Sequence, residues 1–329
     1  MAAPDTGDTR EGNILGLRSC AIAIVGPTAS GKSALAQGLA ERLEGEVLSA
    51  DSMQIYQGMD IGTGKLRPRE RTVAYHGIDL CAPDAPFSAA LYQAYARECL
   101  KDTDLRGRRT VLCGGTGLYI RAAIDDFRFP HGDQADNPTR RYYTRIAEEQ
   151  GADRLWSLLH DRDSASAALI HPNNVRRVVR AFEMLEEGSS YAAQLENLHS
   201  IKQVVPAAIV GLAVDPEVLK ARIARRVDGM VAEGLVEEVA SLLGQGLRAS
   251  ITAPQAIGYK EIVPYLDGTA TLDESVEKIK VATNRYAKRQ RTWFRSDPRI
   301  HWLDADSGDS EELLYRAFGL LGKIGLEVA

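Results

Sequence analysis

The segment GPTASGKS, residues 26–33, has the residue types and spacing of a loop that binds phosphate between a strand and a helix. Its backbone N–H groups, the positive end of the following helix and the Lys32 ammonium would surround an anion, and a diphosphate would fit. The Ser33 hydroxyl would bind the Mg²⁺ that accompanies a polyphosphate. We therefore predict Mg²⁺ as the cofactor, Ser33 as its ligand, and a phosphate-binding set of Gly26, Pro27, Thr28, Ala29, Ser30, Gly31, Lys32 and Ser33.

The loop by itself does not determine the reaction, because a phosphoryl group that is transferred and a diphosphate that leaves need the same anion site. Most such loops belong to nucleotide-binding proteins that cleave ATP, which makes ATP binding the default interpretation. Those enzymes usually place a magnesium-binding aspartate after a second buried strand. Here the best candidate strand, residues 111–113, runs into GGTG at residues 114–117. The missing acid argues against phosphoryl transfer.

Asp51, in the sequence SADSMQIY, is the nearest alternative acid. It follows the predicted strand after the phosphate-loop helix, and open α/β sheets bind ligands in the crevice beyond the carboxyl ends of their strands. We expect its carboxylate to face the phosphate loop. Asp51 would also serve as the N-cap of a following helix, with Ser52 and Gln54 near the helix start, and the residues alone leave both roles open.

A basic segment occupies residues 278–295, which contain seven basic residues and no acid: Lys278, Lys280, Arg285, Lys288, Arg289, Arg291 and Arg295. In a helix, one face would carry Arg285, Lys288, Arg289 and Thr292. Another face, with Tyr286, Gln290 and Trp293, would pack inward. The segment predicts a surface that attracts polyanions, although a solvated helix with aromatic anchors explains the same pattern.

Arginines also cluster in the sequence HPNNVRRVVR, which puts Arg176, Arg177 and Arg180 in one helix. Two basic faces on separate parts of the chain favour a groove for RNA, since arginine binds phosphate oxygens bidentately and stacks on unpaired bases.

A third cluster, in RIARRVDGM, places Arg222, Arg225 and Arg226 on a helix that follows a predicted strand. One of them would reach a diphosphate from the side opposite Lys32. Alternatively, these arginines pair with acids such as Glu237 or Glu238.

Short apolar runs alternate with helical segments along most of the chain, which predicts an α/β fold. Strands are expected in CAIAIVG, GEVLSADS, RTVLCGG, PAAIVGLAVD and RIHWLD, whereas strand signals vanish between Phe129 and about Val204. We predict a P-loop NTPase-like parallel sheet core with helices on both faces, formed by residues 19–128 and 205–322, and an all-helical insertion domain at residues 129–204. Residues 1–18 are predicted to be flexible, and FPHGDQADNP to be a linker into the insertion.

The composition bounds the class of protein. With 329 residues, 44% hydrophobic and 26% charged, the chain is a folded protein and not a disordered one. Four cysteines without C-x-x-C spacing disfavour a zinc finger or a disulfide framework and suit a reducing cytoplasm. No segment approaches about 18 consecutive apolar residues, so no membrane partner is expected. The net charge of −5 disfavours general nucleic-acid binding, so the basic clusters decide what the surface attracts. We expect a monomer.

Seven motifs in order, GPTASGKS, SADSMQIYQGMDIGTGK, CGGTGLYIRA, HPNNVRRVVRAFEML, RRVDGMVAEGLVEEV, QAIGYKE and RYAKRQRTWFR, closely resemble those of bacterial tRNA dimethylallyltransferases, also called tRNA isopentenyltransferases. The resemblance spans Ala21 to about Arg295. It implies transfer of a dimethylallyl group from dimethylallyl diphosphate to N6 of adenosine 37, 3′ of the anticodon, in tRNAs that read codons beginning with U. Diphosphate would be released.

Position by position, the resemblance implies that Asp51, Thr116 and Arg226 are catalytic. Asp51 would meet the N6 amine, Thr116 would lie near the reacting centre, and Arg226 would bind the diphosphate. The implied tRNA contacts are Asp51, Ser52, Met53, Gln54, Arg140, Arg176, Arg177, Arg285, Lys288, Arg289 and Arg291. The insertion at residues 129–204 would contact the tRNA.

Three other functions share some of these features. An adenylate isopentenyltransferase has the same core but needs no tRNA-sized basic insertion, and activity on AMP without tRNA would favour it. A P-loop small-molecule kinase would turn over ATP and would have no use for RYAKRQRTWFR. A non-catalytic RNA-binding P-loop protein would bind tRNA and release no diphosphate.

Overall fold

The computed structural model describes residues 13–127, 129, 137–197, 202–249 and 252–326. The chain divides into two compact units, one formed by Met1–Asp125 with Gln203–Ala329 and the other by Asp126–Lys202. Most of the predicted linker sequence FPHGDQADNP lies outside the described residues. The first unit therefore contains the phosphate loop and the basic segment 278–295, and the second contains the arginines of HPNNVRRVVR.

A six-stranded parallel sheet forms the centre of the first unit, in the order β3-β2-β4-β1-β5-β6. Its strands are β1 (Ala21–Val25), β2 (Glu46–Ser49), β3 (Tyr75–His76), β4 (Thr110–Gly114), β5 (Ala207–Ala213) and β6 (Ile300–Asp304). Every residue of β1, β2 and β4 is buried, as continuous apolar runs in a parallel sheet predict. The predicted α/β fold is confirmed. The two-residue strand β3 is too short for a sequence pattern to reveal.

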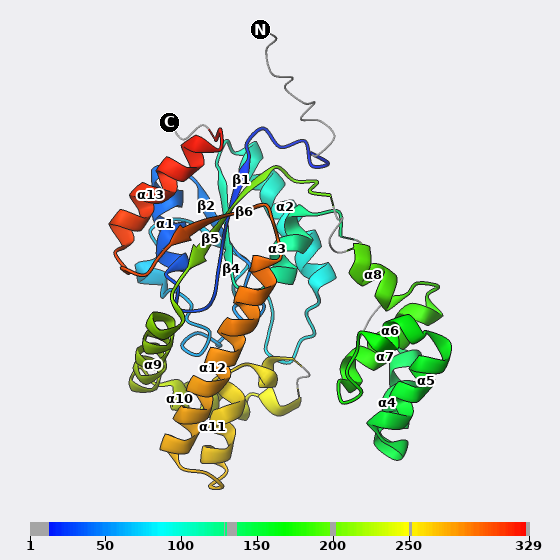
Figure 1. Cartoon of the computed structure of the whole chain (residues 1–329). Coiled ribbons are helices and arrows are strands. Elements are labelled where there is room, and N and C mark those ends of the chain that lie inside the picture. The colour runs from blue at the N-terminus through cyan, green and yellow to red at the C-terminus, as the bar shows by residue number, and fades with distance from the viewer. Residues whose placement is uncertain (1–12, 128, 130–136, 198–201, 250–251, 327–329) are drawn as a thin grey trace, which may run out of the picture. The chain divides into compact units, whose positions relative to one another are not determined.

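Helices cover both faces of this sheet. Figure 1 shows α1 and α13 on one side and α2 and α3 on the other. A further group, α9 to α12, packs together at one end of the unit, where α12 contacts both α9 and α11. The α-helices are α1 (Lys32–Arg42), α2 (Ala89–Leu105), α3 (Gly117–Ile124), α9 (Pro216–Ala232), α10 (Leu235–Gly244), α11 (Tyr259–Leu266), α12 (Leu272–Arg295) and α13 (Ser310–Lys323), and the 3₁₀ helices are η1 (Pro68–Glu70), η2 (Leu247–Ala249) and η3 (Ala253–Gln255). Within the described part of the chain, none of the helices is long and apolar enough to cross a bilayer.

The segment before β1 is anchored to the first unit. The backbone N–H of Ile14 donates to Val204 O at 2.9 Å, and those of Arg18 and Ser19 donate to the Asp104 carboxylate, each at 2.9 Å. The prediction of flexibility for residues 1–18 is therefore wrong for residues 13–18, because these hydrogen bonds fix the backbone. Residues 1–12 lie outside the described residues.

The second unit is helical throughout its described residues. It contains α4 (Pro138–Gln150), α5 (Ala152–Arg162), α6 (Ser164–Ala168), α7 (Val175–Glu186) and α8 (Tyr191–Asn197). Its apolar core joins α4, α5 and α7, with Tyr143 stacked on Phe182 at a ring-centre distance of 3.7 Å. The prediction of an all-helical insertion is confirmed for this described part.

The chain leaves the first unit and returns to it at one place. Asp125 and Gln203 form an antiparallel bridge there, and both Asp125 carboxylate oxygens accept hydrogen bonds from Arg299, at 2.6 and 3.0 Å. Arg121 donates to the same carboxylate at 2.8 Å. Because Asp125 is fully buried, these charge-assisted bonds fix Asp125 within the first unit, at the point where the chain leaves it.

Candidate active site

The phosphate loop joins β1 to α1 as the sequence predicts. Gly31 has a φ of +93°, in the left-handed region that glycine adopts without strain, and it directly precedes α1. A Cβ at Gly26 would lie 3.0 Å from the Leu212 carbonyl oxygen, so the loop packs tightly against β5. The loop thereby ends at the positive N-terminus of α1, where an anion is stabilised.

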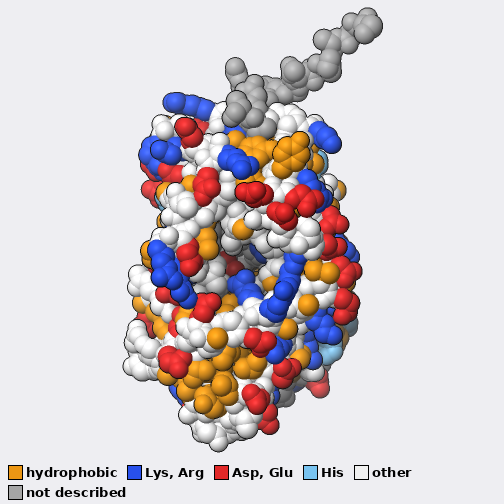
Figure 2. Space-filling view, turned by 90° about the vertical axis from the view of Figure 1, so that its left-hand side faces the viewer, with side chains coloured by type: hydrophobic (Ala, Val, Ile, Leu, Met, Phe, Trp, Pro, Cys, Tyr) orange, Lys and Arg blue, Asp and Glu red, His pale blue; other side chains and the backbone are white. Residues whose placement is uncertain are grey.

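A cavity of about 180 Å³ opens beside this loop. Thr28, Ala29, Ser30, Gly31, Lys32 and Ser33 line one side of it. Its basic side chains come from four separate segments: Lys32, Lys65, Arg71 and Arg226. Figure 2 shows a hollow at mid-height on the displayed face, with Lys and Arg side chains around and inside it. Because Lys65 is paired with Asp60 and Asp79, the positive charge that suits a polyphosphate ligand comes from the other three.

Lys32 is the basic group nearest to the loop backbone, and its Nζ donates to the Pro27 carbonyl oxygen. Burial lowers the pKa of Lys32 to about 8, and the nearby Arg226 guanidinium contributes to the lowering. The ammonium is therefore partly deprotonated at mildly alkaline pH in the absence of a ligand. An anion in the cavity would raise this pKa again, because it stabilises the charged form.

We expect a pH dependence of anion binding from this group. Affinity for inorganic diphosphate should fall above pH 8 by up to about tenfold per pH unit, because the free protein must then take up a proton on Lys32 to bind. Calorimetric titration between pH 7 and 10 measures this. Lys32→Arg should remove the protein's part of the dependence, since arginine stays charged. An equal decline in both proteins would contradict the assignment to Lys32.

Asp51 lies at the same cavity, beyond the carboxyl end of β2. Residues 52–55 form a turn and not a helix, so the alternative of a helix cap is wrong. Instead, Asp51 Oδ1 accepts a hydrogen bond from the Met53 N–H at 2.9 Å, the local turn that aspartate favours. Asp51 therefore both shapes its own turn and faces the cavity.

Thr116 stabilises this turn through hydrogen bonds to Ser52. Its Oγ1 accepts from the Ser52 N–H at 3.0 Å and donates to Ser52 Oγ at 3.2 Å. Thr116 lines neither the phosphate cavity nor the adjacent one described below. This geometry gives Thr116 a positioning role toward the turn at 51–53, and contact with reacting atoms stays a prediction.

Gln54 is turned toward the phosphate side. Its Oε1 accepts from Ser49 Oγ at 2.8 Å, its Nε2 donates to Thr63 O at 3.3 Å, and it lines the phosphate cavity. Ser52 and Met53 line the adjacent cavity instead. Ser52, Met53 and Gln54, three consecutive residues predicted to contact tRNA, thus lie at two different cavities.

Gln290 ties the phosphate loop to helix α12. Its Oε1 accepts from the Thr28 N–H at 2.8 Å, and its Nε2 donates to Gly115 O at 2.9 Å. Gln290 is 5% exposed, and the neighbouring Tyr286 hydroxyl contacts Thr116 and Gln290, while burial raises the pKa of Tyr286 to about 12. The predicted inward packing of Tyr286 and Gln290 is confirmed. The contact of Gln290 with the phosphate loop was not predicted.

Arg226 faces Asp51 across the site. Burial lowers the pKa of Arg226, and the Asp51 carboxylate opposes that lowering. Its guanidinium is 3.5 Å from the Thr63 carbonyl oxygen, and no ion pair with Glu237 or Glu238 is present in the described part of the chain. Arg226 is thus available to bind an anion, which was one of the two predicted alternatives; the other was an ion pair with Glu237 or Glu238.

A second cavity, of about 260 Å³, meets the phosphate cavity at Asp51 and Arg226, which line both. Its wall is largely apolar and includes Met53, Val227, Met230, Ile257 and Ile279. Two cavities, of which the second has the more apolar lining, thus share one acid and one arginine. A flat apolar group and a polyphosphate would fit side by side here, and Asp51 would face the space between them.

The basic segment is part of α12, but its charges point in two directions. A groove of about 620 Å³ between α9 and α12 is lined by Arg285, Lys288, Arg291 and Arg295. Arg289 lines the second cavity instead, with its guanidinium 5.6 Å from the centre of the Tyr286 ring. The predicted face that combined Arg289 with Arg285 and Lys288 is therefore wrong, because Arg289 lies on the Tyr286 side. Trp293 is 39% exposed, but its indole lies against Gly117, where a Cβ would be 2.0 Å from the indole nitrogen, so its predicted inward packing is confirmed only in part.

The second unit holds the remaining predicted contacts. Arg140 forms an ion pair with the buried Glu183, with Nε–Oε1 at 2.6 Å, and Arg180 pairs with the same carboxylate at 2.9 Å. Arg140 thus has an internal role, which sequence could not indicate because 43 residues separate the pair. Arg176 and Arg177 are exposed on α7. Of the three predicted contacts in the described part of this unit, these two are the exposed ones.

The residues at the cavity suit a magnesium ion that is bound mainly by the oxygens of a phosphate ligand. No group of three or more His, Cys, Asp or Glu side chains able to hold a metal occurs among the described residues. Ser33 is exposed at the start of α1 and lines the phosphate cavity with Asp51. Mg²⁺ keeps several waters and needs only one or two protein oxygens when a substrate supplies phosphate oxygens. The residues present fit that arrangement.

Comparison with known proteins relates the chain to one family. The sequence matches the family described as IPP transferase over residues 54–297 and that described as isopentenyl transferase over residues 20–74. A tRNA dimethylallyltransferase of Geobacillus thermodenitrificans is 47% identical over 284 residues, 86% of this chain and 90% of that protein. One of Kocuria rhizophila is 44% identical over 307 residues, 93% of this chain and 94% of that protein.

Solved structures agree with these relatives. The tRNA isopentenylpyrophosphate transferase of Staphylococcus epidermidis is 36% identical, with a TM-score of 0.68 and coverage of 93% of this chain and 100% of that one. A eukaryotic dimethylallyltransferase acting on tRNA is 26% identical, with a TM-score of 0.77 and coverage of 94% and 81%. Both similarities extend over almost the whole chain.

Proposed function

This chain belongs to the tRNA dimethylallyltransferase family and is a prenyltransferase that acts on tRNA. On that premise, we propose that it transfers a dimethylallyl group from dimethylallyl diphosphate to N6 of adenosine 37 in tRNAs that read codons beginning with U. The observation that carries the proposal is the pair of adjoining cavities, one basic at the phosphate loop and one largely apolar, which share Asp51 and Arg226.

On the donor side, the diphosphate would lie on residues 28–33. The loop N–H groups, the N-terminus of α1, Lys32 and Arg226 would stabilise the negative charge that grows as the C–O bond breaks. Mg²⁺, when bound, would neutralise part of the same charge, with Ser33 as its protein ligand. Gln290 supports this side because it fixes the Thr28 backbone.

On the acceptor side, the adenine would enter the second cavity, where Ser52, Met53 and Arg289 lie. A neutral exocyclic amine is a weak nucleophile, and its proton becomes acidic as the N6–C1 bond forms. Asp51 would accept that proton while the bond between C1 and the diphosphate oxygen breaks. The products are N6-dimethylallyl adenosine and diphosphate. The adenine must leave its stack to reach Asp51, which costs least in an anticodon loop.

The tRNA backbone would bind in the α12 groove and at Arg176 and Arg177. The predictions of a monomer and of a cytoplasmic location stay predictions.

Incubation with tRNA and labelled dimethylallyl diphosphate, followed by nucleoside analysis, tests the proposal. Label in N6-substituted adenosine supports it. Modification of free AMP without tRNA would favour the adenylate alternative, and ATP turnover with a metabolite would favour a kinase. Binding of tRNA without release of diphosphate would contradict catalysis.

We expect the α12 groove to contribute phosphate contacts. Replacing Arg285, Lys288 and Arg291 together by glutamine should weaken tRNA binding and reduce the slope of log K against log salt by about 0.7 for each lost single-strand contact. Filter binding at several salt concentrations measures both. Arg316→Gln with Lys323→Gln, on α13, is the control. Unchanged tRNA affinity would mean that the groove is only a solvated surface.

A further inference from the structure

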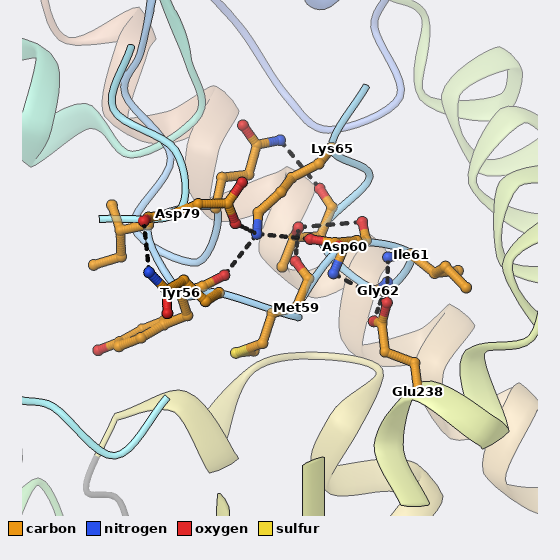
Figure 3. A network of polar contacts seen from close by, with 12 residues as sticks. Tyr56, Met59, Asp60, Ile61, Gly62, Lys65, Asp79 and Glu238 are labelled. Atoms are coloured by element: carbon orange, nitrogen blue, oxygen red, sulfur yellow. Dashed lines mark hydrogen bonds and ion pairs between the residues drawn. The ribbon is translucent and has the colours of Figure 1, made fainter. Parts of the chain in front are cut away.

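The loop at residues 56–65 forms a wall of both cavities. Thr63 lines the two cavities, Gly62 lines the apolar one, and Gly64 lines the phosphate cavity. The loop has no helix or long strand of its own, so its shape depends on side chains that bind it from outside. Figure 3 shows Glu238, which binds the loop from α10, and Lys65, a residue of the loop itself that bonds across it.

Glu238, on the first turn of α10, caps three consecutive N–H groups of this loop. Its carboxylate accepts from Asp60 N at 3.0 Å, Ile61 N at 2.7 Å and Gly62 N at 3.1 Å. The Tyr259 hydroxyl donates to the same carboxylate. Only an ionised carboxylate can accept so many bonds at once, because it has two oxygens and no N–H or O–H of its own. Gly62, the residue of the loop nearest to Glu238 in the sequence among these three, is 176 residues away from it.

Lys65 holds the other end of the loop. Its side chain is 2% exposed, and its Nζ donates to Tyr56 O at 2.6 Å and pairs with Asp60 at 2.8 Å and with Asp79. Lys65 and Glu238 therefore fix the loop from both directions at Asp60 (Figure 3). A loop so anchored cannot adjust independently of α10.

The anchored loop contacts the Arg226 guanidinium. Gly64 has a φ of +63°, and a Cβ there would lie 2.0 Å from Arg226 Nη2, so no larger residue fits without displacing the guanidinium. Thr63 O lies 3.5 Å from the same nitrogen. The position of Arg226 at the junction of the cavities thus depends on where the loop lies.

We propose that Glu238 is a positioning residue for the group transfer: through the backbone at 60–64 it holds the guanidinium of Arg226 in the orientation that binds the diphosphate. The proposal deepens the proposed function and rests on it for the identity of the donor. Nothing in it requires Glu238 to touch the substrate.

Affinity for inorganic diphosphate with Mg²⁺, measured by calorimetry, tests the proposal without turnover. Glu238→Gln keeps the size but replaces one acceptor oxygen by an NH₂ group that faces N–H donors, and it should weaken diphosphate binding about tenfold. Donor KM should rise by a similar factor and tRNA affinity should stay within about twofold. Glu237→Gln, exposed on the same turn, is the matched control and should change neither quantity.

A double-mutant cycle separates positioning from general structural damage. If Glu238 acts through Arg226, Glu238→Gln should weaken diphosphate binding by less than about twofold in an Arg226→Ala background. Equal losses in both backgrounds, or an unchanged diphosphate affinity in folded Glu238→Gln, would overturn the proposal.

A second variant keeps the test decisive if Glu238→Gln does not fold. Gly64→Ala displaces Arg226 directly and should weaken diphosphate binding about as strongly, again only when Arg226 is present. Gly58→Ala, with φ +72° and no contact to Arg226, is its control for backbone strain. A wild-type protein that binds diphosphate but transfers no prenyl group would contradict the proposed function and leave this inference to the binding data.

Discussion

Asp51→Asn should lower the single-turnover rate of prenyl transfer by about two to four orders of magnitude, the range for loss of a general base. Asparagine keeps Oδ1, which accepts the Met53 N–H at 2.9 Å, so the turn at residues 51–53 should persist. It cannot take the N6 proton, nor offset the positive charge that develops on the nitrogen in the transition state. Rapid-quench measurement at saturating tRNA and donor isolates this step.

Binding and stability distinguish this effect from a structural one. Affinities for tRNA and donor and the melting temperature should change little in Asp51→Asn, because the amine in the ground state needs only a hydrogen-bond acceptor. Asp51→Ala, which also removes the turn bond, should lose stability in addition. A rate for Asp51→Asn within a few-fold of wild type would remove Asp51 from the mechanism.

Lys32→Ala should reduce turnover by about two to three orders of magnitude, the usual cost of removing one group that stabilises developing charge. The ammonium lies among the N–H groups of the phosphate loop, where the leaving diphosphate would acquire its charge. The Lys32→Ala protein should retain its affinity for tRNA, since Lys32 does not line the α12 groove. Release of diphosphate, followed with a coupled phosphate assay, measures the effect.

Two controls bear on the same loop. Lys260→Ala removes a cation that lines only the apolar cavity and should leave the affinity for inorganic diphosphate nearly unchanged. Wild-type protein supplied with ATP, tRNA and donor should consume no ATP. Stoichiometric ATP hydrolysis coupled to product formation would contradict a loop that serves only a leaving diphosphate.

The local sequence was sufficient to predict those structural features that depend on residues close together in the chain. The phosphate loop needs a buried strand, a turn with glycine at Gly31 and a helix start, and all three are encoded within residues 21–42. The continuous apolar strands predicted a parallel sheet because such strands are buried on both faces. Ordered motifs identified the family, since their residues must recur together to build one site.

Prediction from the sequence failed where a residue could lie on either of two helix faces, or where its side chain could bind either of two partners. Helical spacing grouped Arg289 with Arg285, but the real boundary of the inward face depends on what α12 packs against, and Arg289 lies over Tyr286. A basic residue such as Arg140 looks like an RNA contact until the buried Glu183 is placed beside it. Isolated charge patterns do not reveal which charges are already paired.

The sequence by itself determined the anion loop and the place of Asp51 directly after a buried strand, because both depend on residues that are close in the sequence. It also determined the class of fold, because continuous apolar strands that alternate with helices predict a parallel sheet. Only the tertiary structure decided that two cavities share Asp51 and Arg226 and that Gln290 binds the Thr28 backbone across 262 residues. It also decided that Glu238 binds the backbone N–H groups of residues 60–62, whereas Arg226 donates to the Thr63 carbonyl oxygen. The physical reason is that a polar side chain takes whichever partner the folded chain brings within hydrogen-bond distance, and that choice is made by packing between distant elements.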